Sequence, residues 1–349
     1  THIYIYPPSY IYTYTHTTMT DIQTQIQHAK EKLLTLTNEM ENIKHIKRNG
    51  SLKQSAVKSR EKLHTIKQLI CSRTLMGHSD NVTSIEWSSQ EGIFVSAGKD
   101  GQLIVWNGIN KSRIQTIKHK TQWLMTCAYE CSANRLVATG GADRVCSVFI
   151  VGQVGMTHPS AELKGHDGYL SSCKFLGVNN IVTASGDSSA TVWDITRVQA
   201  KHSFTEHAAD CLDVATHPSQ QSFATASADC TVKLWDVNSG SCTHTFHGHE
   251  SDVNSVAYFP DGVAVGTAST DSTCKVFDTR SYGEVASFES DDSQVPASSV
   301  CFSRSGRLMF VGYSDGSCKA WDTTSPTSSP SFVLTEHTGD VTSVGLSAS

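Results

Sequence analysis

The stretch GHESDVNSVAYFPDGVAVGTASTDSTCKVFD, residues 248–278, decides the fold, because its order of turns and strands recurs along most of the chain. A Gly-His turn opens it and leads into an alternating apolar strand. A second turn around Asp271 leads into another strand, which ends in Phe277 and Asp278. Short apolar runs bounded by Gly, Pro, Asp and Ser are typical of strands joined by tight turns. The stretch therefore predicts an all-β unit.

The same pattern returns before and after this stretch. Gly-His or Glu-His turns also open GHSDNVTSIEW, GHDGYLSSCKF, EHAADCLDVAT and EHTGDVTSVGL. The strands after the second turns read KDGQLIVWN, ADRVCSVFI, GDSSATVWD, ADCTVKLWD and SDGSCKAWD. Their aromatic residues recur every 42 to 44 positions, at Trp106, Phe149, Trp193, Trp235, Phe277 and Trp321. Four-stranded units of this period, framed by Gly-His and Trp-Asp, are typical of the WD40 β-propeller.

A polar set repeats with this frame. In blades of this type the resemblance implies a hydrogen-bonded chain of the His, the turn Asp, a strand Ser or Thr and the Trp, since buried polar groups are tolerated when they are paired. A His followed by an Asp 21 or 22 residues later could suggest a catalytic dyad, but this pair recurs, whereas an active site is normally built once. The expected structural residues are His78, Asp100, Trp106, His166, Asp187, Trp193, His207, Asp229, Trp235, His249 and Asp271.

Composition and motifs give no positive reason to propose an enzyme. The chain of 349 residues has a net charge of -5, which argues against a main role in binding nucleic acid. It contains no P-loop, nucleophile elbow, HExxH or paired-carboxylate motif. The 11 cysteines form no CxxC pair and no zinc-type spacing, so we interpret them as reduced, mostly buried thiols. We expect no catalytic residue, no cofactor and no metal site.

Segments between the repeat frames carry a more specific resemblance. WLMTCAY (123–129), GHDGYLSSCKFL (165–176), IVTASGD (181–187), GHESDVNSVAYFPDG (248–262) and FSRSGRLMFVGYSDG (302–316) resemble the β subunit of heterotrimeric G proteins. This resemblance implies a seven-bladed propeller that signals without catalysis. Such a subunit pairs with a γ subunit, holds the GDP-bound α subunit, and signals to effectors downstream of G protein-coupled receptors.

The resemblance also implies a binding patch for the α subunit and for effectors on one rim of the ring. Each of its residues could instead be a core residue, but Trp123 lies outside the regular aromatic frame and is the best candidate. An apolar centre flanked by carboxylates is typical of a protein-binding hot spot. The expected contact residues are Trp123, Met125, Tyr169, Asp210, Leu212, Asp252 and Asn254.

Several aligned rim positions depart from the family pattern. Ser79, Asn81 and Thr83 stand where the family usually has Leu, Lys and Tyr, Ala142 replaces a Leu, and Thr270 replaces an Asp. Roughly half of the patch is thus altered. We expect weaker α or effector binding, or a partner that has diverged to match.

The stretch DIQTQIQHAKEKLLTLTNEMENIKH (21–45) predicts a coiled-coil helix, because its apolar residues follow a 4, 3, 4, 3, 4, 3 spacing. A seam this narrow needs a partner to cover it. The resemblance implies that the partner is the γ subunit, and self-dimerisation through the same seam is the alternative. The expected γ-facing residues are Ile22, Ile26, Ala29, Leu33, Leu36, Met40 and Ile43.

We divide the chain into a leader (1–18), the coiled-coil helix (19–46), a basic linker (47–70) and the propeller (71–349). The leader is expected to be non-native or disordered, or else a β-prone tail used by a partner. The linker belongs to a basic run from Lys44 to Arg73, which has nine Lys or Arg and the single acid Glu61. We expect it to be a solvated segment, or else a surface that approaches anionic lipid. EHTGDVTSVGLSAS ends the sequence without two further strands, so we expect the seventh blade to be incomplete and both ends to reflect an imperfect gene model.

Two functions from other classes stay open at this point. A general WD40 scaffold or adaptor, of corepressor or coat type, predicts a self-associating coiled coil and no dependence on guanine nucleotide. A propeller hydrolase predicts carboxylates that converge on the central channel. If the chain is a G protein β subunit, we expect it to be cytoplasmic and to lie at the inner face of the plasma membrane. A lipid on the γ subunit would hold it there, so its attachment would be peripheral.

Overall fold

The computed structural model describes residues 71, 73–90, 92–152, 158–289, 295–324 and 329–347, which all belong to one compact unit. The expected leader, coiled-coil helix and linker lie outside these residues. The seven seam residues from Ile22 to Ile43 therefore stay predictions.

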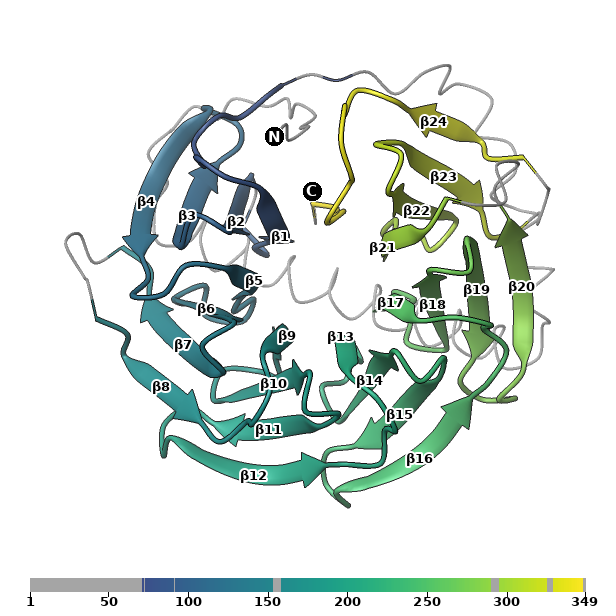
Figure 1. Cartoon of the computed structure of the whole chain (residues 1–349), viewed down its shortest axis with the longest axis horizontal. Helices are drawn as coiled ribbons and strands as arrows, with labels where there is room; N and C mark the ends of the chain where they lie inside the picture. Colours follow the sequence, from purple (N-terminus) through teal and green to yellow (C-terminus); the bar gives the residue numbers. More distant parts are fainter. Residues whose placement is uncertain are drawn as a thin grey trace, which may run out of the picture. The chain divides into compact units, whose positions relative to one another are not determined.

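The described residues form six four-stranded antiparallel sheets, the blades, whose first strands lie nearest a common centre (Figure 1). Blades 1 to 3 consist of β1 (Val82–Trp87), β2 (Ile93–Gly98), β3 (Gln102–Asn107), β4 (Ser112–Lys118), β5 (Leu124–Tyr129), β6 (Leu136–Gly141), β7 (Val145–Ile150), β8 (Ala161–Lys164), β9 (Leu170–Phe175), β10 (Asn180–Ser185), β11 (Ala190–Asp194) and β12 (Gln199–Phe204). Blades 4 to 6 consist of β13 (Cys211–Thr216), β14 (Ser222–Ser227), β15 (Val232–Asp236), β16 (Ser241–Phe246), β17 (Val253–Tyr258), β18 (Ala264–Ser269), β19 (Thr273–Asp278), β20 (Glu284–Glu289), β21 (Ala297–Phe302), β22 (Leu308–Tyr313), β23 (Cys318–Asp322) and β24 (Phe332–Leu334).

Burial explains the residue types along each blade. The second strands, such as SFATAS in β14, are almost fully buried on both faces and are built from small and β-branched residues. The outermost strands, such as QAKHSF in β12, are mostly exposed and polar. The radial position of a strand therefore sets its polarity.

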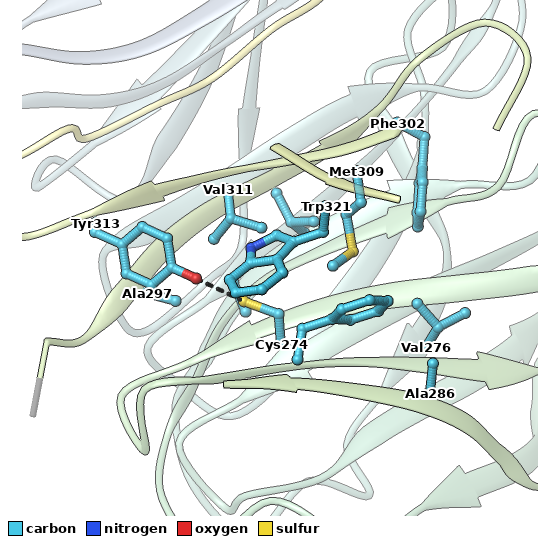
Figure 2. Packing of buried hydrophobic residues seen from close by; sticks show 12 residues of the cluster. Cys274, Val276, Ala286, Ala297, Phe302, Met309, Val311, Tyr313 and Trp321 are labelled. Atoms are coloured by element: carbon cyan, nitrogen blue, oxygen red, sulfur yellow. Dashed lines mark hydrogen bonds between the residues drawn. The ribbon is translucent and has the colours of Figure 1, made fainter. Parts of the chain in front are cut away.

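The hydrophobic core lies between neighbouring blades. Between blades 5 and 6, Figure 2 shows Trp321 among Val311, Met309 and Cys274, and all four side chains are buried. The Cys274 thiol lies 3.7 Å from the Tyr313 hydroxyl, and burial raises the pKa of this thiol to about 12. Both groups are therefore neutral, as expected for a dry interface.

The prediction of seven blades was wrong, because six are present in the described part of the chain. Residues 341–345 have the sequence of an inner strand, but they form no strand in the structure. A β-strand needs a neighbouring strand to pair with, and these residues have none among the described residues. The expected closing segment around Cys71 to Leu75 also forms no strand. Leu75 is nevertheless buried against Phe94, Ile104 and Trp106 of blade 1.

The 341–345 segment still links blade 6 to blade 1 (Figure 1). On the blade 1 side, the Thr342 hydroxyl donates to the Val82 carbonyl at 2.7 Å and the Ser343 hydroxyl accepts from the Ile85 N–H at 3.2 Å. On the blade 6 side, the Val344 N–H donates to the Ser299 hydroxyl at 3.1 Å. Through these bonds, residues 341–345 lie where the inner strand of a seventh blade would lie.

Hydrogen bonds of the same two kinds, a hydroxyl that donates to a carbonyl and a hydroxyl that accepts from an N–H, join other neighbouring blades. At the second position of the inner strand, the Thr83 hydroxyl donates to the Leu124 carbonyl at 2.7 Å and the Ser171 hydroxyl to the Cys211 carbonyl at 2.5 Å. At the third position, the Ser255 hydroxyl accepts from the Val300 N–H at 3.3 Å. The final segment therefore repeats the side-chain bonds between neighbouring inner strands, without the backbone ladder of a complete blade.

We predict that Thr342→Val lowers the free energy of unfolding by about 1 kcal/mol, the usual net contribution of one hydrogen bond. Thermal unfolding would measure it. Thr116→Val, at an exposed position of β4, is the matched control. Equal effects of the two changes would contradict a closing role for Thr342.

Candidate functional site

The repeated polar residues form a fixed chain inside each of several blades. In blade 3, His166 Nδ1 lies 2.8 Å from Asp187 Oδ2, and His166 Nε2 lies 2.8 Å from the Thr183 hydroxyl. The Trp193 indole N–H donates to the same hydroxyl at 2.8 Å. An ionised Asp only accepts, so it fixes the His proton on Nδ1 and leaves Nε2 to accept from Thr.

The chain recurs in the other predicted blades. In blade 1, His78 joins Asp100 at 3.0 Å and Ser96 at 2.7 Å, and the Trp106 indole donates to Ser96 at 2.8 Å. In blade 4, His207 lies 2.7 Å from both Asp229 and Thr225, and the Trp235 indole donates to Thr225 at 2.8 Å. In blade 5, His249 lies 2.8 Å from Asp271 and 2.7 Å from Thr267, while Phe277 supplies no N–H.

Blade 2 contains a variant of this chain that was not predicted from the sequence. There the Thr121 hydroxyl stands between the two partners, 2.8 Å from His119 Nδ1 and 3.0 Å from Asp143 Oδ2. His119 Nε2 lies 3.0 Å from the Ser147 hydroxyl. Lys118 stands where the usual frame has Gly, and the inserted Thr121 lengthens the spacing from the His to the Asp. Only the 41-residue distance from His78 could have indicated that His119 belongs to the repeat.

The electrostatics of these groups fit a structural role. Burial would raise the pKa of Asp229, but hydrogen bonds from Thr231 and His207 outweigh it and hold this pKa at about 2. Burial lowers the pKa of His207, with Asp229 opposing the shift. At neutral pH the pair is thus a carboxylate with a neutral imidazole, and both side chains are largely buried.

Four of the expected contact residues share one structural position. Trp123, Tyr169, Asp210 and Asp252 each directly precede the inner strand of a blade. The carbonyl of each accepts from the backbone N–H that follows the second strand of the same blade, at 2.9 Å in three blades and 3.3 Å for Trp123. The fold therefore brings these four residues to the same end of the blades.

Met125, Leu212 and Asn254 are the second residues of their inner strands. The Met125 side chain is 36% exposed, and Leu212 is half-buried. Asn254 donates to the Ala297 carbonyl of the next blade at 2.8 Å and to the Thr270 hydroxyl at 3.0 Å. Asn254 therefore supports the ring as well as lying near the rim.

Trp123 is the most exposed of the seven, with 58% of its surface accessible. Its backbone has a φ of 67°, in the left-handed region. A Cβ on Gly141 would lie 2.1 Å from the Trp123 carbonyl oxygen, so this glycine permits the close approach. An exposed indole on a strained, hydrogen-bonded backbone is a rigid protrusion.

Tyr169 and Asp210 are joined across the boundary between blades 3 and 4. The Tyr169 hydroxyl donates to Asp210 Oδ2 at 2.8 Å. Burial and this carboxylate together raise the pKa of Tyr169 to about 12. The phenol is neutral at physiological pH and orients the carboxylate.

The divergent positions take different roles. Thr83 gives its hydroxyl to the inter-blade bond with Leu124, and the Ser79 N–H donates to Asp100 at 2.9 Å. Asn81 and Ala142 are exposed near Trp123. The side chains of Thr83 and Thr270 thus bond within the fold, whereas those of Asn81 and Ala142 change the surface.

The described residues include two polar cavities but no metal-binding cluster. No group of three His, Cys, Asp or Glu side chains there could hold a metal ion. Two polar cavities of about 250 and 360 Å³ lie in blades 4 and 5, away from Trp123 and Met125. Nor does the described part contain a helix of the length and apolarity that a membrane span requires.

Comparison with known proteins identifies the family. A family model for G protein beta WD-40 repeat proteins matches residues 23–349. The chain belongs to this family. A guanine nucleotide-binding protein subunit beta from Lymnaea stagnalis is 53% identical over 256 residues, which cover 73% of this chain and 75% of that protein.

Membership of the G protein β family agrees with a rim built for protein contact. Proteins of this family are WD40 scaffolds and not enzymes. The polar His and Asp residues lie inside the blades, whereas Trp123 and Met125 lie on the surface. Trp123 and Met125 are therefore open to contact with a protein partner, whereas the buried His and Asp residues are not.

We predict that acid destabilises this G protein β-family chain through the buried pairs. The lowered pKa values of His207 and His249 mean that their stabilisation is present above pH about 6.5 and is lost as pH falls. The depressed pKa of Asp229, about 2, preserves its contribution until pH falls below about 4. Unfolding curves from pH 7 to pH 2 would measure both steps.

Asp229→Asn tests the second step. The variant should be less stable than the parent at pH 6, and the difference should shrink below pH 4, where the parent carboxylate becomes protonated as it unfolds. A difference that stays constant with pH would contradict this role of the carboxylate.

Proposed function

We propose that this chain is the β subunit of a heterotrimeric G protein, which pairs with a γ subunit, holds the GDP-bound α subunit on its rim and signals to effectors when α leaves. The observation that carries the proposal is the exposed pair Trp123 and Met125 at the start of β5, in a chain of the G protein β family. Aromatic and Met side chains with flanking carboxylates are the usual centre of protein interfaces.

The rim supports a switching mechanism without any chemistry of its own. Asp210 and Asp252 flank the apolar residues and can set the orientation of a partner with basic side chains. In this mechanism the α segment packs on Trp123 in the GDP state. GTP reshapes that segment, the contacts are lost, and the same residues become available to effectors.

The γ subunit is assigned to the expected coiled-coil helix. The seven apolar positions from Ile22 to Ile43 form the seam, and a partner helix would bury it. A lipid on γ would then hold the complex peripherally at the inner face of the plasma membrane. Neither nucleic acid nor a small-molecule cofactor has a role in this proposal.

The decisive experiment is nucleotide-dependent co-purification. The endogenous protein, affinity-purified in GDP and in a non-hydrolysable GTP analogue, should keep a small prenylated chain in both samples. It should lose a partner of the size of a G protein α subunit only with the analogue. Self-association with no dependence on nucleotide would favour a general WD40 scaffold instead.

We predict that Trp123→Ala weakens binding of the α subunit by about 2 kcal/mol and leaves γ binding intact, because a hot-spot aromatic loses its packing area. A titration with purified GDP-bound α would measure it. Tyr282→Ala is the matched control, since Tyr282 is 49% exposed in the turn between β19 and β20, at the opposite end of blade 5 from the rim. Loss of both partners together would assign Trp123 to the fold.

Changing Leu33 and Leu36 to Asp should have the opposite selectivity. Two charges in the seam remove γ binding first, because a coiled coil cannot bury them unpaired. Retention of γ by this double variant would overturn the assignment of the seam.

A further inference from the structure

Lys99 occupies a position where the other described blades carry no charge. It follows the second strand of blade 1, directly after Gly98. Its side chain is half-buried. The equivalent residues of the other blades are Ala142, Gly186, Ala228, Thr270 and Ser314.

Lys99 contacts Trp123 through both its backbone and its side chain. Its carbonyl accepts from the Trp123 N–H at 3.2 Å, and its own N–H donates to the Asn81 carbonyl at 2.9 Å. Its Nζ lies 5.3 Å from the centre of the Trp123 ring, a cation–π geometry. Lys99 of blade 1 therefore holds the backbone of Trp123 through one contact and its indole ring through the other.

The charge of Lys99 is not neutralised within the described residues. The neighbouring Asp100 is already bound by His78 and by the N–H groups of Ser79 and Gln102. In the described part, no carboxylate forms a salt bridge with Lys99. The exposed indole thus has a positive charge beside it.

The opposite part of the rim carries negative charge. Asp210 and Asp252 precede the inner strands of blades 4 and 5. A partner that covers both regions meets a cation beside Trp123 and carboxylates two and three blades further round. Complementary charges fix the orientation of such a partner and speed its association.

We propose that Lys99 is a specificity-determining residue of the rim. It holds the Trp123 ring in the conformation that binds, which lowers the ordering cost of association. It also selects an α subunit segment that presents a carboxylate beside the apolar side chain packed on Trp123. This inference rests on the proposed function, and it gives the chemistry that the partner segment must have.

The test measures the affinity of the purified βγ complex for a GDP-bound G protein α subunit at about 50 mM and about 400 mM NaCl, which differ strongly in screening. Lys99→Gln should weaken binding about threefold to tenfold at low salt, and less at high salt, because both the cation–π contact and the ion pair are lost. Lys99→Arg should restore binding, since a guanidinium also stacks on indole. The control Lys111→Gln changes an exposed lysine in the turn between β3 and β4, at the other end of blade 1.

A second arm identifies the carboxylate. Each Asp and Glu of the α segment that binds the rim is changed to its amide. One of these changes should weaken binding to the parent complex but not to the Lys99→Gln complex. Such coupling assigns the ion pair to that residue.

The outcomes separate the inference from the function. If Lys99→Gln binds like the parent at both salt concentrations while Trp123→Ala still weakens binding, the role of Lys99 is overturned and the function stands. An equal loss at both salt concentrations, with no coupled carboxylate, overturns selection by charge. If the folded parent complex does not bind α in GDP, the proposed function fails, and the inference fails with it.

Discussion

The hydrogen bonds between adjacent inner strands are the constraint on which the rest of the structure depends. Hydroxyl side chains such as Thr83 and Ser171 reach the backbone of the next blade, which fixes the register of blade against blade near the centre. At Met125 and Leu212 the same position is apolar and cannot donate. Met125 and Leu212 therefore lack the side-chain hydrogen bond to the next blade, and both belong to the expected contact residues. Asn254, the remaining expected contact residue at this strand position, keeps the inter-blade bond.

The separation of polar interior from apolar surface explains why a protein rich in His and Asp pairs can lack catalytic chemistry. In the chain around His166 the side chains bond to one another, and the hydrogen bonds to Asp187 keep the pKa of this carboxyl at about 2. Nothing remains to be donated to a ligand. Side chains such as Trp123, by contrast, are left uncovered by the blades.

The sequence could predict the blades because their period is carried by residues within one repeat, such as His249, Asp271 and Phe277. The sequence could not predict that residues 341–345 would form no strand, because a strand forms only where another strand lies beside it in the fold. It also missed His119, where an inserted Thr121 changes the local spacing. Trp123 was recognisable because it breaks the aromatic frame. Its contact with Lys99 was not, because it joins two blades whose register only the fold determines.

The segment at 341–345 gives the ring uneven mechanical properties. Blades 1 to 6 are each braced by backbone ladders over four strands, whereas this joint is braced by contacts such as Thr342 to Val82 and Ser299 to Val344. Deformation of a ring concentrates at its most compliant joint, so breathing motions open this seam before they disturb blades 2 to 5. The distances among Trp123, Tyr169, Asp210 and Asp252 then stay nearly constant. Tyr169 and Asp210 lie farthest from this joint, whereas Trp123 and Asp252 are each separated from it by one blade, and Lys99 belongs to blade 1, which borders it.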